Sequence, residues 1–224
     1  MPDSQLPSFY VHIVESPSPA DLLDGRTEGR VLCSFLDVAG IPYLYNLAVD
    51  ANQFSVAMTD RILQGGELFG LPPILHISCH GAETGIQLTD QREAGVLIPW
   101  SDLATYLRPI HQFTNGLGVC MSSCHGGQGR QMAQVLKPEE IPFSWIVGAG
   151  DNIDLRDVAL AYAVFYRCFQ RGNLETVIDA MHGAAGGGGF QIAFGQFTQQ
   201  QYRETLLKGF REWLASRSTT QSGG

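Results

Sequence analysis

Ile74-Leu-His-Ile-Ser-Cys-His-Gly81 is the stretch that decides the fold of this chain. It begins after two prolines and stops at a glycine, and its apolar and β-branched residues are typical of a buried β-strand. A second stretch of the same kind, Gly116-Leu-Gly-Val-Cys-Met-Ser-Ser123, runs into Cys124. The interval between them is long enough for the crossover that two parallel strands require. We therefore expect two parallel strands, one ending at His80 and the other leading to Cys124.

Strands and helices alternate on both sides of these two stretches. Short apolar and β-branched runs bounded by turn residues predict strands at 9–15, 43–49 and 143–147, and a hairpin-like region over 85–98. Helical spacing of apolar residues predicts helices over 26–39, 53–63, 100–107, 154–170, 174–181 and 198–216, with Ser101 as the N-cap of the third. A further helix is expected soon after Cys124, and the glycine-rich segment 183–190 is expected to be a flexible loop. This alternation predicts a three-layer α/β/α fold around a mainly parallel sheet.

The bulk composition limits the class of protein. The 224 residues are 44% hydrophobic and 16% charged, which is typical of a globular chain, so we expect one domain over 1–217 and a disordered tail over 218–224. No apolar run approaches the ~20 residues of a membrane span, and the N-terminus has no secretion signal, so we expect a cytoplasmic protein with no membrane partner. Five cysteines, an odd number, predict free thiols in a reducing compartment. A net charge of −8 argues against direct binding of nucleic acid.

His80 and Cys124 are the residues from which we predict chemistry. The carboxyl ends of parallel strands share the sheet edge where α/β proteins bind their ligands. A thiol nucleophile needs an imidazole to take and return its proton, and amide donors for an oxyanion. We assign Cys124 as the nucleophile, His80 as the general base and the amides of Gly81 and Cys124 as the oxyanion hole, and we expect the N-terminus of the following helix to stabilise the thiolate. The separation of His80 from Cys124 by 44 residues is close to the ~50 of a caspase-type pair.

Leu75-His-Ile-Ser-Cys-His-Gly81 and Val119-Cys-Met-Ser-Ser-Cys-His-Gly126 resemble the paired histidine and cysteine motifs of the caspase, metacaspase and CHAT-domain proteases. The CHAT branch fits best, because segments 85–90 and 100–103 and the helix with Phe165 and Tyr166 also resemble it, and the resemblance covers roughly residues 72–185. It implies a caspase-like fold and a cysteine endopeptidase that forms a thioester on Cys124 without a metal or other cofactor. It also implies a protein or peptide substrate, an activating partner or ligand, and a role in prokaryotic antiviral defence.

Substrate recognition is the point at which the chain departs from part of this group. Metacaspases similar to this chain carry aspartate two residues before the catalytic cysteine, where Ser122 stands here. With serine in that position, the resemblance implies no strict preference for a basic residue before the cleaved bond (P1). Ser122 and, by family position, Asp151 are the candidate substrate-binding residues.

Alternative functions fit these residues less well. Geometry opposes a zinc site on Cys120 and Cys124, because four residues of a strand span about 13 Å, whereas two thiolates on one zinc lie within about 4 to 5 Å. The same spacing separates His76 from His80 and leaves His76 a structural role in the core. An α/β-hydrolase with Cys124 as nucleophile and His182 as base is an alternative. A latent or noncatalytic caspase-like adaptor that keeps the fold without turnover is another.

Overall fold

The central sheet positions the candidate residues. A computed structural model describes residues 7–89, 95–172, 176–187 and 189–221. The strands lie in the order β2-β1-β3-β6-β7-β8; neighbours among the first five are parallel, and β8 is antiparallel to β7. β4 and β5 form a hairpin at the carboxyl end of β3. This confirms the predicted α/β class and the mainly parallel sheet. The strands are Tyr10–Ser16 (β1), Tyr43–Leu47 (β2), Pro73–Ala82 (β3), Gly85–Leu88 (β4), Val96–Pro99 (β5), Gly118–Ser122 (β6), Trp145–Ala149 (β7) and Phe190–Phe194 (β8).

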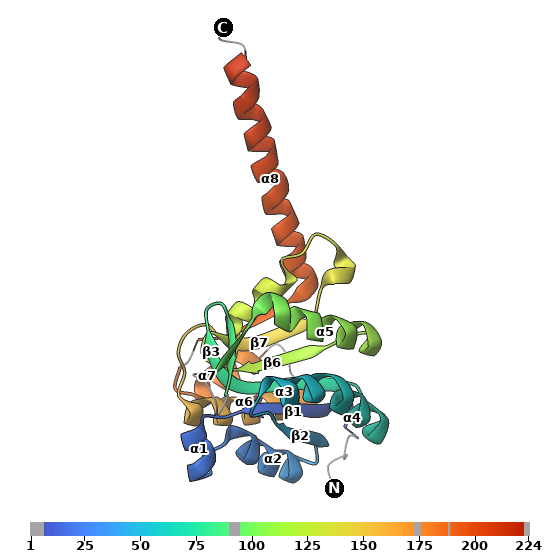
Figure 1. Ribbon diagram of the computed structural model, residues 1–224, viewed down its shortest axis with the longest axis vertical. Helices are drawn as coiled ribbons and strands as arrows, with labels where there is room; N and C mark the ends of the chain where they lie inside the picture. Colours follow the sequence, from blue (N-terminus) through green and yellow to red (C-terminus); the bar gives the residue numbers. More distant parts are fainter. Residues whose placement is uncertain (1–6, 90–94, 173–175, 188, 222–224) are drawn as a thin grey trace.

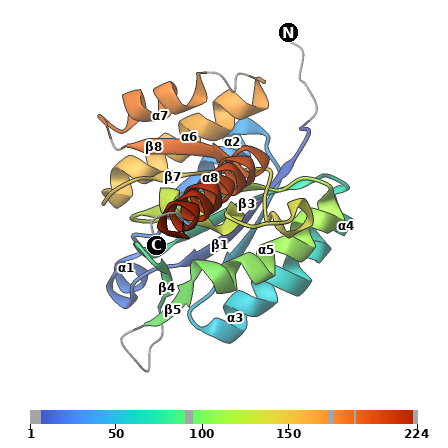
Figure 2. The ribbon, with the colours of Figure 1, turned by 90° about the horizontal axis from the view of Figure 1, so that it is seen from above.

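Helices cover both faces of the sheet (Figures 1 and 2). α2, α6 and α7 pack on one face, and α3, α4 and α5 pack on the other, each over its own hydrophobic cluster. The helices are Pro19–Asp24 (α1), Glu28–Ala39 (α2), Ala51–Val56 (α3), Ile62–Phe69 (α4), Trp100–Thr114 (α5), Leu155–Gln170 (α6), Val177–Ala184 (α7) and Gly195–Gln221 (α8). Three other helical segments are the π-helix Ala57–Arg61 (η1) and the 3-10 helices Gly126–Ala133 (η2) and Pro138–Glu140 (η3).

α6 shows how the sequence pattern produces this packing. The carboxylate of Asp154 accepts a hydrogen bond from the amide of Arg156 and so caps the helix start. Tyr162, Phe165 and Tyr166 recur at three- and four-residue spacing and are fully buried against the sheet. Each such aromatic side chain contributes roughly 1.5–3 kcal/mol by its burial, so the stripe predicted over 154–170 anchors this layer.

The helical segment after β2 is longer than predicted. We expected a helix over 53–63 stopped by the glycine pair at 65–66, whereas helical turns continue from 51 to 69. Gly65 lies inside the helix because it packs against the ring of Tyr10, and an added Cβ would lie 2.7 Å from that ring. The helix ends at Gly70, whose φ of 63° is in the left-handed region that favours glycine.

The expected helix over 100–107 also continues further, and its predicted N-cap is wrong. A proline occupies the N-cap position, and the hydroxyl of Ser101 donates to the neighbouring carboxylate of Asp102 at 3.0 Å. α5 continues through Pro109 because Ile110 beyond it is buried in the core, so tertiary packing offsets the lost backbone hydrogen bond.

The last part of the chain contains a strand that the sequence did not predict. β8 includes Phe190, at the end of the segment expected to be a flexible loop, because its backbone pairs with β7 along the sheet edge. α8 then projects from the body of the molecule (Figure 1) and extends to Gln221, into the segment 218–224 that was expected to be disordered. Residues 222–224, 90–94 of the expected hairpin and 174–175 of an expected helix lie outside the described residues. Within the described chain, no helix is both long and apolar enough to cross a membrane.

Candidate active site

The two predicted strand ends lie side by side. β3 and β6 are parallel neighbours, with Ser78 opposite Ser122, and the paired positions differ by 44 throughout. The residue numbers of His80 and Cys124 also differ by 44, and each residue lies two positions after its serine of the Ser78–Ser122 pair. The register that holds the strands therefore brings the imidazole and the thiol to one edge of the sheet. Both residues line one cavity, His80 exposed and Cys124 partly exposed. The structure therefore brings together the pair assigned from the sequence.

Gly81 lies directly against the Cys124 main chain. A Cβ at position 81 would overlap the carbonyl oxygen of Cys124 and would lie 2.9 Å from its carbonyl carbon. Only glycine allows this approach. β3 does not stop at His80 but continues to Ala82, because the hairpin strand β4 pairs with its last residues. The oxyanion role of the Gly81 and Cys124 amides remains a prediction.

The turn after Cys124 differs from the predicted helix start. His125 has a φ of 56°, and its amide donates 3.1 Å to the carbonyl of Asp151. The segment that follows, η2, is a 3-10 helix rather than an α-helix. Its glycines press against β7, where a Cβ on Gly148 would meet the backbone of Gly126 at 2.5 Å, and glycine is a poor former of α-helix. The first amide after Cys124 is thus bonded to Asp151, and the expected stabilisation of the thiolate by the N-terminus of the following helix stays a prediction.

The cavity beside the dyad is small and acidic. Its volume is about 140 Å³, the room of roughly five water molecules at ~30 Å³ each and the scale of one amino-acid side chain. Its polar lining includes three carboxylates and one guanidinium, and that guanidinium, Arg26, is already paired with Asp21 at 3.6 Å and with Asp24 at 2.7 Å. We call it the dyad cavity, and it is lined by Glu15, Ser16, Pro17, Ser18, Asp21, Arg26, Glu28, Ser78, Cys79, His80, Ser122, Ser123, Cys124, Ile153 and Val158.

The two candidate substrate-binding residues, Ser122 and Asp151, lie in different places relative to the dyad cavity. Ser122 lines the dyad cavity and is buried, with its hydroxyl donating 2.5 Å to Glu28. Asp151 is exposed and is not among the cavity-lining residues; its carbonyl holds His125 instead. The structure therefore places Ser122 at the site and places Asp151 in the support of the Cys124 turn.

Glu28 is the site residue that sequence reasoning missed. Its side chain is fully buried and its Oε2 accepts hydrogen bonds from Ser78 at 2.6 Å and from Ser122. Its Oε1 lies 3.3 Å from Nε2 of His76, whose Nδ1 lies 3.0 Å from the hydroxyl of Tyr166. This confirms the structural role predicted for His76. In the sequence, the position of Glu28 directly after Thr27 indicates only the start of a helix, where acidic residues are common.

A second buried carboxylate lies near Glu28. Glu15 accepts hydrogen bonds from the amide of Gly29 at 2.9 Å and from the hydroxyl of Tyr45 at 2.7 Å. Burial raises the pKa of the Glu15 carboxyl, and the nearby Glu28 charge raises it further. The lining of the dyad cavity thus includes two buried carboxyl groups, Glu15 and Glu28, that accept hydrogen bonds from neighbouring hydroxyl and backbone groups.

Two other cysteines and one other histidine have structural surroundings, although Cys79 also lines the dyad cavity. Cys79 packs against the core on the α5 side and Cys120 is buried, as expected for structural thiols. His182, the base of the alternative hydrolase, lies on α7 with its Nε2 3.0 Å from the carbonyl of Phe190, and it does not line the dyad cavity. In the part of the chain that the structure describes, no group of three or more His, Cys, Asp or Glu side chains could hold a metal ion.

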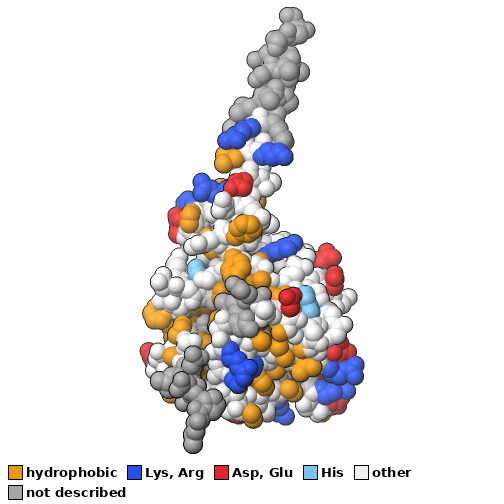
Figure 3. Space-filling model, turned by 180° about the vertical axis from the view of Figure 1, so that it is seen from behind, with side chains coloured by type: hydrophobic (Ala, Val, Ile, Leu, Met, Phe, Trp, Pro, Cys, Tyr) orange, Lys and Arg blue, Asp and Glu red, His pale blue; other side chains and the backbone are white. Residues whose placement is uncertain are grey.

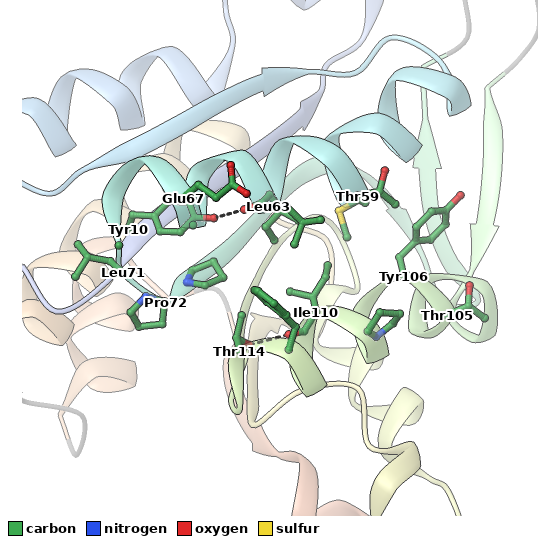
Figure 4. Close-up of a pocket in the computed structure, with 17 residues that line it drawn as sticks. Tyr10, Thr59, Leu63, Glu67, Leu71, Pro72, Thr105, Tyr106, Ile110 and Thr114 are labelled. Atoms are coloured by element: carbon green, nitrogen blue, oxygen red, sulfur yellow. Dashed lines mark hydrogen bonds between the residues drawn. The ribbon is translucent and has the colours of Figure 1, made fainter.

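A larger cavity lies elsewhere in the molecule. It has a volume of about 960 Å³ between α4 and α5 (Figure 4), with Tyr10 and Pro73 from the amino ends of β1 and β3 in its wall. The hydroxyl of Tyr10 donates to the carbonyl of Ile62, and that of Thr114 to the carbonyl of Ile110, so these groups satisfy the protein's own backbone. The described residues that line it include neither cysteine nor histidine, so they offer no thiol and imidazole of the kind found at the opposite end of β3.

Comparison with known proteins adds no family. No protein-family model matches the chain, and no curated protein matches its sequence. The geometry of the site is therefore the basis for the functional conclusion.

The basic side chains on the face shown in Figure 3 are scattered rather than gathered into one patch.

Proposed function

We propose that the chain is a cysteine endopeptidase with a caspase-like arrangement of its sheet, in which Cys124 is the nucleophile and His80 the general base. The observation that carries this proposal is the common register of β3 and β6, which brings an accessible thiol and an accessible imidazole to one cavity. A thiol and an imidazole at such an edge are the two groups that acyl transfer requires.

The reaction follows from these groups. The Cys124 sulfur attacks the carbonyl carbon of a peptide bond, and its proton passes to His80. The amides of Gly81 and Cys124 donate to the oxyanion that forms. His80 then returns the proton to the leaving amine as the C–N bond breaks, which leaves a thioester on Cys124. Water, deprotonated by His80, attacks the thioester, and release of the carboxylic acid restores the thiol.

The dyad cavity supports a role in holding one substrate side chain. It adjoins both catalytic groups, is large enough for a single side chain, and carries more acidic than basic groups. A protein or peptide substrate with a cationic side chain before the cleaved bond matches this lining. The motif resemblance to CHAT-domain proteases supports a place in prokaryotic defence, with an activating partner or ligand.

Cleavage of a mixed fluorogenic peptide library by the wild type and three variants tests the proposal. Cys124→Ala and His80→Ala are each expected to abolish cleavage, whereas His182→Ala keeps it. Loss with His182→Ala and retention with His80→Ala would instead support the hydrolase alternative. A peptidyl thiol-reactive inhibitor added to the same samples reports the state of Cys124 where no peptide is cleaved, and absence of labelling in the wild type would contradict the proposal.

A further inference from the structure

The buried Glu28 carboxylate joins the two strands that carry the candidate dyad. One of its oxygens, Oε2, accepts from Ser78 on β3 at 2.6 Å and from Ser122 on β6 at 2.5 Å. These serines are register partners across the two strands. A single oxygen atom of α2 thus bridges β3 and β6 through two charge-assisted hydrogen bonds, which are about twice as strong as neutral ones.

The bridge lies one step before the reacting groups. Side chains two residues apart on a strand point to the same face and lie about 7 Å apart. Ser78 precedes His80 by two residues on β3. Ser122 is the last residue of β6, and Cys124 follows two residues later in the turn. All four residues line the dyad cavity with Glu28. A change in the separation of the two serines therefore changes the separation of the imidazole and the thiol.

The cost of burying this group indicates that it has a specific role. The Glu28 side chain has no solvent exposure, and desolvation of a carboxylate costs several kcal/mol, so an apolar residue would fill the space at lower cost. Its second oxygen lies 3.3 Å from Nε2 of His76 without the geometry of a hydrogen bond, and it has no hydrogen-bond partner among the described residues. Hydrogen bonds from the two serines are thus the contacts that fix the carboxylate.

We propose that Glu28 is a positioning residue, which sets the spacing of His80 and Cys124 by holding Ser78 and Ser122 on one carboxylate oxygen. This inference rests on the proposed function. Glu28 acts through the two strands and contacts neither the substrate bond nor the thiol. Its removal leaves both serine hydroxyls without their acceptor and frees the strand ends to separate.

The test measures the rate at which iodoacetamide alkylates Cys124 between pH 5.5 and 9, because this reaction needs neither substrate nor activator. At pH 6 an isolated thiol is almost wholly protonated, whereas a thiol paired with an imidazole reacts as its thiolate. Glu28→Ala is expected to lower the alkylation rate at pH 6 by about tenfold, toward the rate of His80→Ala, and to leave the rate at pH 9 unchanged. Glu28→Gln, which keeps an acceptor oxygen, is expected to restore most of the rate.

Control variants separate positioning from stability and from the dyad itself. His12→Gln changes another buried polar side chain, whose Nε2 lies 2.9 Å from the carbonyl oxygen of Ala57 and which does not line the dyad cavity, and it is expected to keep the wild-type pH profile. Circular dichroism and thermal unfolding confirm that each variant is folded at the assay temperature; if Glu28→Ala is not, the double variant Ser78→Ala/Ser122→Ala removes the same bridge. A folded bridge variant with the wild-type pH profile, while His80→Ala slows labelling, would overturn the positioning role alone. A wild-type profile unaffected by His80→Ala would overturn the proposed function as well.

Discussion

A single added carbon atom at Gly81 tests the geometry of the site. A Cβ there would overlap the carbonyl oxygen of Cys124 and lie 2.9 Å from its carbonyl carbon and 3.0 Å from Cβ of Ser123. Ordinary contacts between carbon atoms are about 3.5–4.0 Å, so position 81 and Cys124 must separate by at least ~0.6 Å, and by more to clear the oxygen. The two Cys124 atoms belong to the main chain, so no side-chain rotation relieves the overlap.

The expected loss follows from this displacement. Misplacing catalytic groups by about 1 Å lowers the rate by up to ~100-fold, which corresponds to about 2.7 kcal/mol of transition-state stabilisation. We expect Gly81→Ala to lower kcat/KM for peptide cleavage at least about tenfold per titrated active site. Overpacking is expected to lower the free energy of unfolding by about 1–3 kcal/mol, measured by urea denaturation.

Gly183→Ala is the matched control for this substitution. Gly183 lies in α7, and an added Cβ there meets nothing within 4 Å. Alanine is a better helix former than glycine by about 1 kcal/mol, so this variant should keep its activity and gain slightly in stability. A folded Gly81→Ala protein with wild-type kcat/KM would refute the requirement for close approach of β3 to Cys124.

Three further predictions concern the cavity, a buried histidine and the thiols. Peptides with Arg or Lys at P1 should be cleaved at least about tenfold faster than those with Asp, a difference of about 1.4 kcal/mol, because the dyad cavity carries an excess of carboxylates; equal rates would contradict this. Burial lowers the pKa of His12 to about 4, below the ~6.5 of the unfolded chain, so the unfolding free energy should fall by about 3 kcal/mol as the pH falls from 6.5 to 4. Urea denaturation across this pH range should show that the unfolding free energy depends less on pH in His12→Gln than in the wild type. An identical pH dependence in the two proteins would mean that other groups cause the loss. Burial raises the pKa of Cys33 to about 11 and those of Cys79 and Cys120 further, so peptide mass mapping should find iodoacetamide on Cys124 before these three at pH 7.

The sequence was sufficient to predict the five parallel strands β1, β2, β3, β6 and β7 and the meeting of His80 with Cys124. Both residues follow apolar runs whose ends are marked by glycine, and parallel strands of an α/β sheet place such ends together. The 44-residue separation proved to be the register of β3 and β6 itself. The contact of Gly81 with the Cys124 main chain, by contrast, is visible only in the folded chain.

The parts that could not be predicted depend on tertiary partners. Glu28 follows Thr27 at a helix start, where an exposed acid is common, and only the fold shows that serines from two strands surround it. β8 depends on pairing with β7, which outweighs the loop signal of the preceding glycines. The helix after Cys124 was expected from apolar spacing, but packing of its glycines on β7 gives a 3-10 helix instead.

The most direct test of the account is the labelling of Cys124 by a peptidyl thiol-reactive inhibitor, followed by intact-protein mass in the wild type, His80→Ala and His182→Ala. The account predicts one inhibitor per chain, on Cys124, at a rate that falls at least about tenfold in His80→Ala because the thiol loses its base, and that is unchanged in His182→Ala. Labelling of Cys124 that is independent of His80, or the absence of labelling in the folded wild type, would contradict the assignment of these two residues as a catalytic dyad.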